Sequence, residues 1–348
     1  MKVVRQLTLV ILSAIPLMAS AESLDAAKEA LDAGTPAEAE SILADVSREE
    51  ERDELFYLLA ETARQHGHYS ETGNQLNRID DPVWASMGYF NLAMSHLMEE
   101  SFSRARIALR VTRSLAGPAS DPAASEMGNR ARLVEGILAL RGGKPATAAA
   151  SFAAISTDSV TVPQALYLLG VARARTGELH RAVQTWKRVE SFPVALPGVA
   201  EARIARVWAH REQQQYRQAL STTKLNRRYL DKVMADINEL RDRVRRDGLE
   251  TMVRDEVNQN EDLVDFLRAG RNIASSTSMA WFFRFLETGG SIEGSERQLN
   301  EAFLAFLGEQ ESLIQRFKDR TLQQQATLFE RIALEQADER PMQRGGWE

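Results

Sequence analysis

The residue types that most often carry catalysis occur in this sequence without catalytic spacing. Five histidines lie between His66 and His210, and no pair has the His-Glu-x-x-His spacing that binds zinc on one face of a helix. Cysteine is absent, which excludes a thiol nucleophile, a thiolate metal site and a thioether-linked haem. The sequence therefore predicts no catalytic residue, no metal ligand and no cofactor.

A few short patterns could imitate a site. The stretch Ser221-Thr222-Thr223-Lys224 has the Ser-x-x-Lys spacing of some acyl-transferring serine enzymes, but the companion sequences Ser-Asp-Asn and Lys-Thr-Gly do not occur. Gly142-Gly143-Lys144 precedes a proline, which fits a turn better than a phosphate-binding loop. We interpret the basic run Arg241–Arg246 and the pair His66-Gly67-His68 as solvated surface.

The clearest structural element is a pair of short helices within residues 164–192. Leu166, Leu169 and Gly170 fall on one face of a first helix, and Gly177 ends that helix. The second helix has an apolar stripe at Leu179, Ala182, Val183, Trp186 and Val189. This order of a bulky residue, Leu-Gly, a glycine turn, an alanine and an aromatic residue resembles a tetratricopeptide repeat.

Comparable turns recur at Gly34, Gly67, Glu100, Gly143, Gly177 and Gln214. The intervals are 33, 33, 43, 34 and 37 residues, close to the ~34-residue period of this repeat class, and the longest contains the loop Gly117–Pro122. The resemblance covers residues 24–226 and implies an all-α, tetratricopeptide-like α-solenoid of about six helical hairpins, followed by a C-terminal helical region. Small residues should let paired helices approach closely, at Ala60, Ala93, Gly136 and Gly170.

Beyond the repeats the hydrophobic pattern changes. Three- and four-residue steps alternate through Leu230, Val233, Ile237, Leu240 and Val244, which predicts a coiled-coil-like seam on a longer helix. An aromatic cluster lies between Met279 and Leu286, and a last helix is expected from Gln298 to about Ala337. The predicted organisation is a leader at 1–21, the α-solenoid at 22–228, a helical extension at 229–288, a flexible connector at 289–296, an amphipathic helix at 297–340 and a disordered tail at 341–348.

The N-terminal residues predict export. Lys2 and Arg5 precede an apolar run that ends in Ala19-Ser20-Ala21, as in a secretory signal peptide cut after Ala21. The run is too short for a spanning helix, and no other run reaches that length, so no transmembrane segment is expected in the mature chain. Removing the leader changes the net charge from −6 to −8, and this acidic balance argues against nucleic-acid binding. We expect a periplasmic protein.

The resemblance also implies where a partner would bind. In tetratricopeptide repeats the first helices of successive hairpins line a concave groove, and here the groove positions are mostly apolar. An uncovered strip of this kind would exceed the apolar surface that a soluble protein normally tolerates, so something should cover it. The expected partner-binding groove consists of Tyr57, Phe90, Met94, Leu97, Leu133, Ile137, Tyr167, Val171 and Trp208.

The leading hypothesis is a non-catalytic periplasmic scaffold or adaptor that holds a protein partner, of unknown identity, in cell-envelope assembly, secretion or export. A related hypothesis is that the chain's own C-terminal half, from Tyr229 to Leu334, covers part of the groove, because a tethered ligand has a high effective concentration. Self-association through the C-terminal helices is compatible with both. The alternative is an envelope enzyme, for example in peptidoglycan turnover, with a C-terminal active site and the repeats as a recognition arm.

Overall fold

The computed structural model describes residues 18–46, 52–116, 121–259 and 296–338. Most of the predicted leader lies outside these residues, as do the aromatic cluster between Met279 and Leu286, most of the predicted connector and the predicted tail. The described residues form helices joined by short turns and contain no strand, so the all-α prediction is confirmed. None of these helices is long and apolar enough to cross a membrane.

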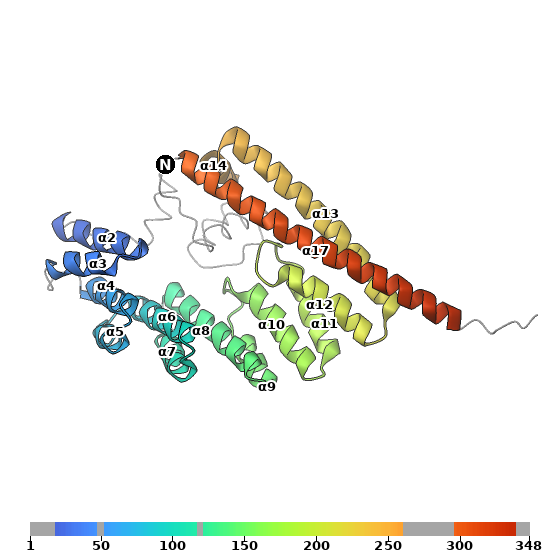
Figure 1. The fold of residues 1–348 in the computed structure, drawn as a ribbon, viewed down its shortest axis with the longest axis horizontal. Helices are drawn as coiled ribbons and strands as arrows, with labels where there is room; N and C mark the ends of the chain where they lie inside the picture. The colour runs from blue at the N-terminus through green and yellow to red at the C-terminus, as the bar shows by residue number, and fades with distance from the viewer. Residues whose placement is uncertain (1–17, 47–51, 117–120, 260–295, 339–348) are drawn as a thin grey trace, which may run out of the picture. The chain divides into compact units, whose positions relative to one another are not determined.

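The helices are labelled as in Figure 1. Their bounds are α2 Met18–Asp32, α3 Pro36–Ala44, α4 Arg52–Gln65, α5 Tyr69–Leu76, α6 Pro82–Met98, α7 Phe102–Leu115, α8 Pro122–Arg141, α9 Pro145–Ala153, α10 Val162–Arg175, α11 Leu179–Val189, α12 Val199–Glu212, α13 Tyr216–Asp247, α14 Leu249–Gln259 and α17 Glu296–Asp338.

The chain divides into two compact units. Among the described residues, unit 1 comprises those within 18–142 and 154–160, and unit 2 comprises 143–153, 161–259 and 296–338. The division falls at the turn of the fourth predicted hairpin, between α8 and α9.

Unit 1 is built from helix pairs that pack on their neighbours. The pairs are α2 with α3, α4 with α5, and α6 with α7, and α6 also contacts α4 and α8. α2 and α3 pack on α4 in a cluster of their own. The core shared by α4 to α8, which we call the unit 1 core, contains Phe56, Ala60, Leu76, Ile79, Ala85, Leu92, Ala93, Ala108, Leu109, Ala131 and Leu138. Ala60 and Ala93, two of the small residues singled out in the sequence, are fully buried in it.

The turns confirm the repeat spacing predicted from the sequence. All six predicted turn residues have positive φ, from +57° at Glu100 to +83° at Gly177. Glycine adopts this conformation without steric cost, whereas the Cβ of Glu100 and Gln214 makes it unfavourable there. Asp81, the residue before Pro82, is the N-cap of α6: its backbone is extended, and its carboxylate accepts hydrogen bonds from the amides of Val83 and Trp84.

Unit 2 repeats the same arrangement. α10 packs on α9 and α11, α11 on α12, and α12 on α13. Gly170 of α10 shows why this helix pair needs a small residue: a Cβ at this position would lie 2.6 Å from Cδ1 and Cε2 of Trp186. The Trp186 indole is fully buried and donates a hydrogen bond of 2.9 Å to the carbonyl of Tyr167.

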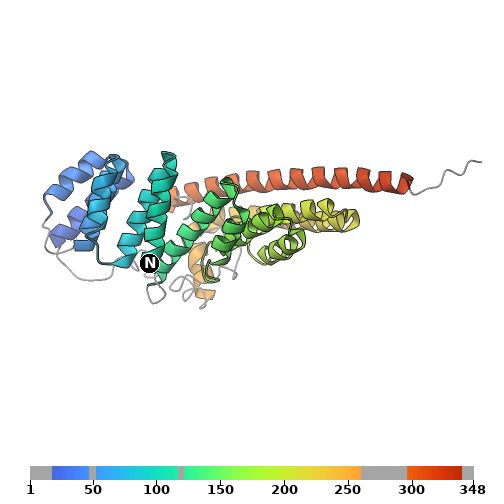
Figure 2. The ribbon, with the colours of Figure 1, turned by 90° about the horizontal axis from the view of Figure 1, so that it is seen from below.

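α13 connects the last hairpin to the C-terminal helices without a break. It runs for 32 residues, so the predicted boundary between residues 228 and 229 falls inside one helix. The five predicted seam residues, from Leu230 to Val244, are all buried in it. α17 packs along α13 over most of this length, as Figures 1 and 2 show.

The two long helices are antiparallel. Ion pairs join Arg241 to Glu311 and Asp231 to Lys318, and near the other end Arg331 lies over the ring of Tyr216. Every third or fourth residue of each helix faces the partner helix, as in a coiled coil. We call this interface the α13–α17 seam; its buried positions run from Ala219 to Val244 on α13 and from Phe303 to Leu328 on α17.

Candidate partner-binding faces

The predicted groove residues of α4 and α6 come together in unit 1. Tyr57 of α4 and Phe90, Met94 and Leu97 of α6 all pack against the unit 1 core, and each keeps part of its side chain accessible. The ring of Tyr57 also lies 5.0 Å from that of Trp84, at a tilt of 48°. These four half-buried residues of α4 and α6, all predicted for the groove, are what we call the α4–α6 face.

α8 adds to unit 1 the remaining residues predicted there. Leu133 is buried, and Ile137 is half-buried, next to Val134, which packs on the unit 1 core. Leu133 therefore serves the interior of the unit more than its surface.

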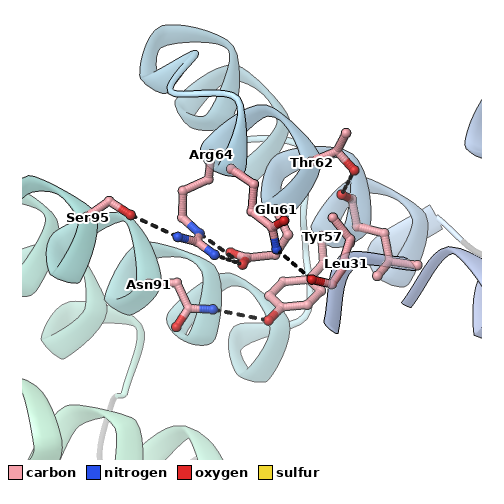
Figure 3. A network of polar contacts seen from close by, with 9 residues as sticks. Leu31, Tyr57, Glu61, Thr62, Arg64, Asn91 and Ser95 are labelled. Carbon is pink, nitrogen blue, oxygen red and sulfur yellow. Dashed lines mark hydrogen bonds and ion pairs between the residues drawn. The ribbon is translucent and has the colours of Figure 1, made fainter. Parts of the chain in front are cut away.

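Polar side chains also join α4 to α6 (Figure 3). The guanidinium of Arg64 donates to Glu61 Oε2 at 2.9 and 2.7 Å, and it also donates to Ser95 Oγ at 2.9 Å. Asn91 donates to the hydroxyl of Tyr57 at 3.3 Å. We call these five residues the polar clamp, because they fix two neighbouring first helices to each other.

The clamp contains a buried ion pair. Glu61 is only 7% exposed, and its Oε1 has no hydrogen-bond partner among the described residues. Burial, followed by the nearby carboxylate of Glu61, raises the pKa of Tyr57 well above its ordinary value, so the hydroxyl stays protonated. The α4–α6 face thus includes a neutral phenol, and α4 also carries a buried carboxylate that is paired with Arg64.

Asn91 and Ser95 were missed in the sequence because isolated polar residues on a helix are usually solvated. A signal for them exists in the repeat spacing. Asn91 lies 34 residues after Tyr57 and Ser95 lies 31 after Arg64, close to one repeat period. Residues one period apart occupy matching positions on adjacent first helices. Polar residues at that separation are therefore candidates for hydrogen bonds between the two helices.

In unit 2, α17 lies over the predicted groove residue Trp208. Trp208 lines a cavity of about 220 Å³ together with Val207 and Arg211 of α12 and with Gln323, Gln324, Thr327 and Leu328 of α17. Leu328 is buried in a small cluster with Val207 and Ala219, flanked by Tyr216 and Leu220. We call the surface formed by Val207, Trp208, Tyr216, Ala219 and Leu220 the α12–α13 face.

Tyr167 interacts electrostatically with α17. Burial raises its pKa; the carboxylate of Glu201 adds to this effect and the guanidinium of Arg320 on α17 opposes it. Val171 is half-buried one helical turn further along α10. Of the three groove residues predicted in this unit, Trp208 therefore has direct cover from the C-terminal helix.

Other candidates from the sequence are ordinary surface or core. His66 and His68 are exposed, with stacked rings 5.7 Å apart, in the turn before α5. Within the described ranges, no group of three or more histidine, aspartate or glutamate side chains is arranged to hold a metal ion. Thr222 and Thr223, from the Ser-x-x-Lys pattern, are buried and donate to carbonyls of their own helix.

Comparison of the chain with protein-family models gave no match, and comparison with curated proteins gave none either.

Proposed function

We propose that this protein is a non-catalytic adaptor of the bacterial cell envelope, exported to the periplasm, which holds a helical segment of a partner protein on the faces of its helical hairpins. The hairpins would act in the manner of tetratricopeptide repeats. The partner would belong to the machinery of envelope assembly, secretion or export.

The observation that carries this proposal is the α4–α6 face. Phe90, Met94 and Leu97 follow the steps of four and three residues that an amphipathic helix presents to a complementary helix. Each keeps accessible surface although it packs on a core, so a partner could bury more of it. Methionine also adapts its shape to different partners, and the neighbouring Met98 is 77% exposed.

The polar clamp supports the same proposal. A face that binds partners by shape has to keep its form when empty, and hydrogen bonds between α4 and α6 hold two of its helices in fixed register.

The test compares recovery of partners from a periplasmic extract of the producing bacterium. Immobilised mature protein is compared with Phe90→Asp, and Ile107→Asp is the matched control, because Ile107 is 55% exposed on α7 of the same unit. A charge at Phe90 should reduce recovery of specific partners at least tenfold, and a charge at Ile107 should not. Equal recovery by folded Phe90→Asp protein would contradict the proposal.

A further inference from the structure

The two halves of the α13–α17 seam differ in composition. From Phe303 to Phe317, α17 buries Phe303, Phe306, Leu307, Gln310, Ile314 and Phe317. Beyond Thr321 the burial almost stops: between residues 322 and 335, Leu328 alone is buried, and most of the others are exposed. The C-terminal part of α17, residues 321–338, is therefore held by much less apolar surface than the part before it. We call it the distal segment.

The seam is also polar at the start of the distal segment. The coiled-coil register fixed by Arg241–Glu311 and by Ala219–Leu328 places Thr321 opposite Asn226 and Gln324 opposite Thr223. Thr321 and Thr223 donate to carbonyls of their own helices, and Asn226 donates to the carbonyl of Arg203 on α12. Oε1 of Gln324 and Oε1 of Gln325 are buried without a hydrogen-bond partner among the described residues. Such unsatisfied groups weaken an interface.

Packing around the distal segment is open as well. Besides the cavity at Trp208, a second cavity of about 420 Å³ is lined by residues of the α12–α13 hairpin, among them Tyr216, and by Thr327, Leu328 and Leu334 of α17. Arg211, Thr327 and Leu328 border both cavities. Leu328 therefore borders two open hollows between the distal segment and the α12–α13 hairpin, where the helices are not closely packed.

Contacts that do not involve α17 also hold α12 to α13. Asn226 ties α13 to α12 at 3.0 Å, and the guanidinium of Arg203 lies 3.6 Å above the ring of Tyr229. The stretch of α13 that carries the α12–α13 face is also basic: from Tyr216 to Leu230 it has Arg217, Lys224, Arg227 and Arg228 and no acidic residue. Its charge favours an acidic ligand.

We propose that the distal segment is a displaceable cover of the α12–α13 face, and that an acidic amphipathic helix of a partner protein replaces it. The incoming helix places apolar side chains at the positions of Thr321, Gln324 and Leu328. The buried amide oxygen of Gln324, which has no hydrogen-bond partner, is then replaced by an apolar group, and the contact that Leu328 makes with Val207 and Ala219 is kept. An acidic residue in place of Gln325 then faces Arg227. This inference rests on the proposed function. It states which kind of partner binds the predicted groove at Trp208, and it states that the distal segment regulates that binding.

The absence of cysteine from the chain makes a clean test available. The double variant Thr223→Cys/Gln324→Cys puts two thiols in one layer of the seam, and their oxidation locks the distal segment in place. The probe is a fluorescein-labelled peptide of residues 317–338 carrying Thr321→Leu, Gln324→Leu and Gln325→Glu. Its matched control carries Gln325→Lys instead. Binding is measured by fluorescence anisotropy on the mature full chain.

We expect the wild type and the reduced variant to bind the probe alike, the oxidised variant to bind at least tenfold more weakly, and the Gln325→Lys peptide to bind at least threefold more weakly than the probe. Equal binding by oxidised and reduced protein, failure of the disulfide to form, or no binding by the reduced protein would each overturn the proposal.

Hydrogen exchange on the unmodified protein gives a second measurement. Amides of residues 324–335 should exchange at least tenfold faster than those of residues 303–317 of the same helix, and equal protection would overturn the proposal. The Phe90→Asp variant should still bind the probe. If the partner test at Phe90 fails while the disulfide still controls probe binding, the adaptor role at the α4–α6 face is wrong and the displaceable cover stands.

Discussion

The α4–α6 face of unit 1 lies on the first helices of two neighbouring hairpins, the α12–α13 face of unit 2 lies on the two helices of one hairpin, and the two faces are stabilised differently. The first is fixed from within by the polar clamp, where Arg64 compensates the buried carboxylate of Glu61. The second is covered from outside by α17 of the same chain. The repeats therefore show two ways to keep an apolar face in water. One face is held in a fixed form by a buried ion pair beside it, and the other is covered by a helix of the same chain.

The largest effect is expected from breaking the clamp. Arg64→Leu leaves the carboxylate of Glu61 buried without its cation, which should cost about 3 kcal/mol of stability in unit 1. Glu61→Leu/Arg64→Leu removes both charges and should recover most of that loss. Thermal unfolding of the two variants measures the difference. If both were equally unstable, the pair would matter for its packing and not for its charge.

A matched pair of glycine substitutions compares the helix contacts of the two units. Gly170→Ala places a methyl against the rigid, fully buried indole of Trp186 and strains its hydrogen bond to Tyr167, so a cost of about 2 kcal/mol is expected. Gly88→Ala in unit 1 meets a methyl group of Leu76, a side chain that can rotate away, and should cost less. Urea unfolding of both variants tests the order, and the reverse order would show that unit 2 is the more adaptable.

The two non-glycine turns offer a smaller, stabilising change in each unit. Glu100 has a φ of +57° and Gln214 of +58°. Replacing either with glycine relieves the strain of the Cβ but increases the freedom of the unfolded chain, so a net gain of about 0.5–1 kcal/mol is expected. Melting temperatures of Glu100→Gly and Gln214→Gly measure it. Gly67→Ala, at a φ of +77°, is the converse control and should destabilise.

The smallest effect concerns the pH dependence of unit 1. Burial lowers the pKa of His96, and the nearby Arg104 adds to this while Glu99 opposes it. The unfolded chain therefore binds this proton more readily, so stability is full above the ordinary pKa of about 6.5 and declines as the pH falls through the lowered value. His96→Gln should remove this part of the decline in chemical unfolding between pH 7 and 5. An unchanged pH profile would contradict the assignment.

Sequence was sufficient where one residue determines one backbone conformation. The positive-φ turns were found from glycines and their spacing, which then pointed to Glu100 and Gln214. The need for a small residue at Gly170 followed from the hairpin pattern, although its cause, the ring of Trp186, is seen only in the folded hairpin. The groove positions on α4 and α6 were predicted from the resemblance; the structure shows those side chains half-buried, and a groove that binds a partner stays a prediction.

Sequence was insufficient where distant segments meet. No residue between Tyr216 and Asp247 breaks the helix. The sequence nevertheless suggested a boundary after residue 228, because the resemblance to the repeat ends near there. The apolar face of α17 was visible, but its register against α13 depends on contacts such as Arg241 with Glu311, 70 residues apart. The clamp was missed for the same reason: Arg64 and Ser95 are adjacent only after the two helices have packed.

The continuity of α13 has a mechanical consequence. A helix of 32 residues is about 48 Å long, and α13 is at once the last helix of the hairpins and one side of the seam. Without a glycine or proline hinge between Tyr216 and Asp247, it transmits bending and torsion as a rigid rod. A force applied near Val244, in the half of the seam with more buried apolar surface, therefore moves α13 as one rigid body. The displacement appears at Asn226 and in the hairpin and is not absorbed by local bending of the helix.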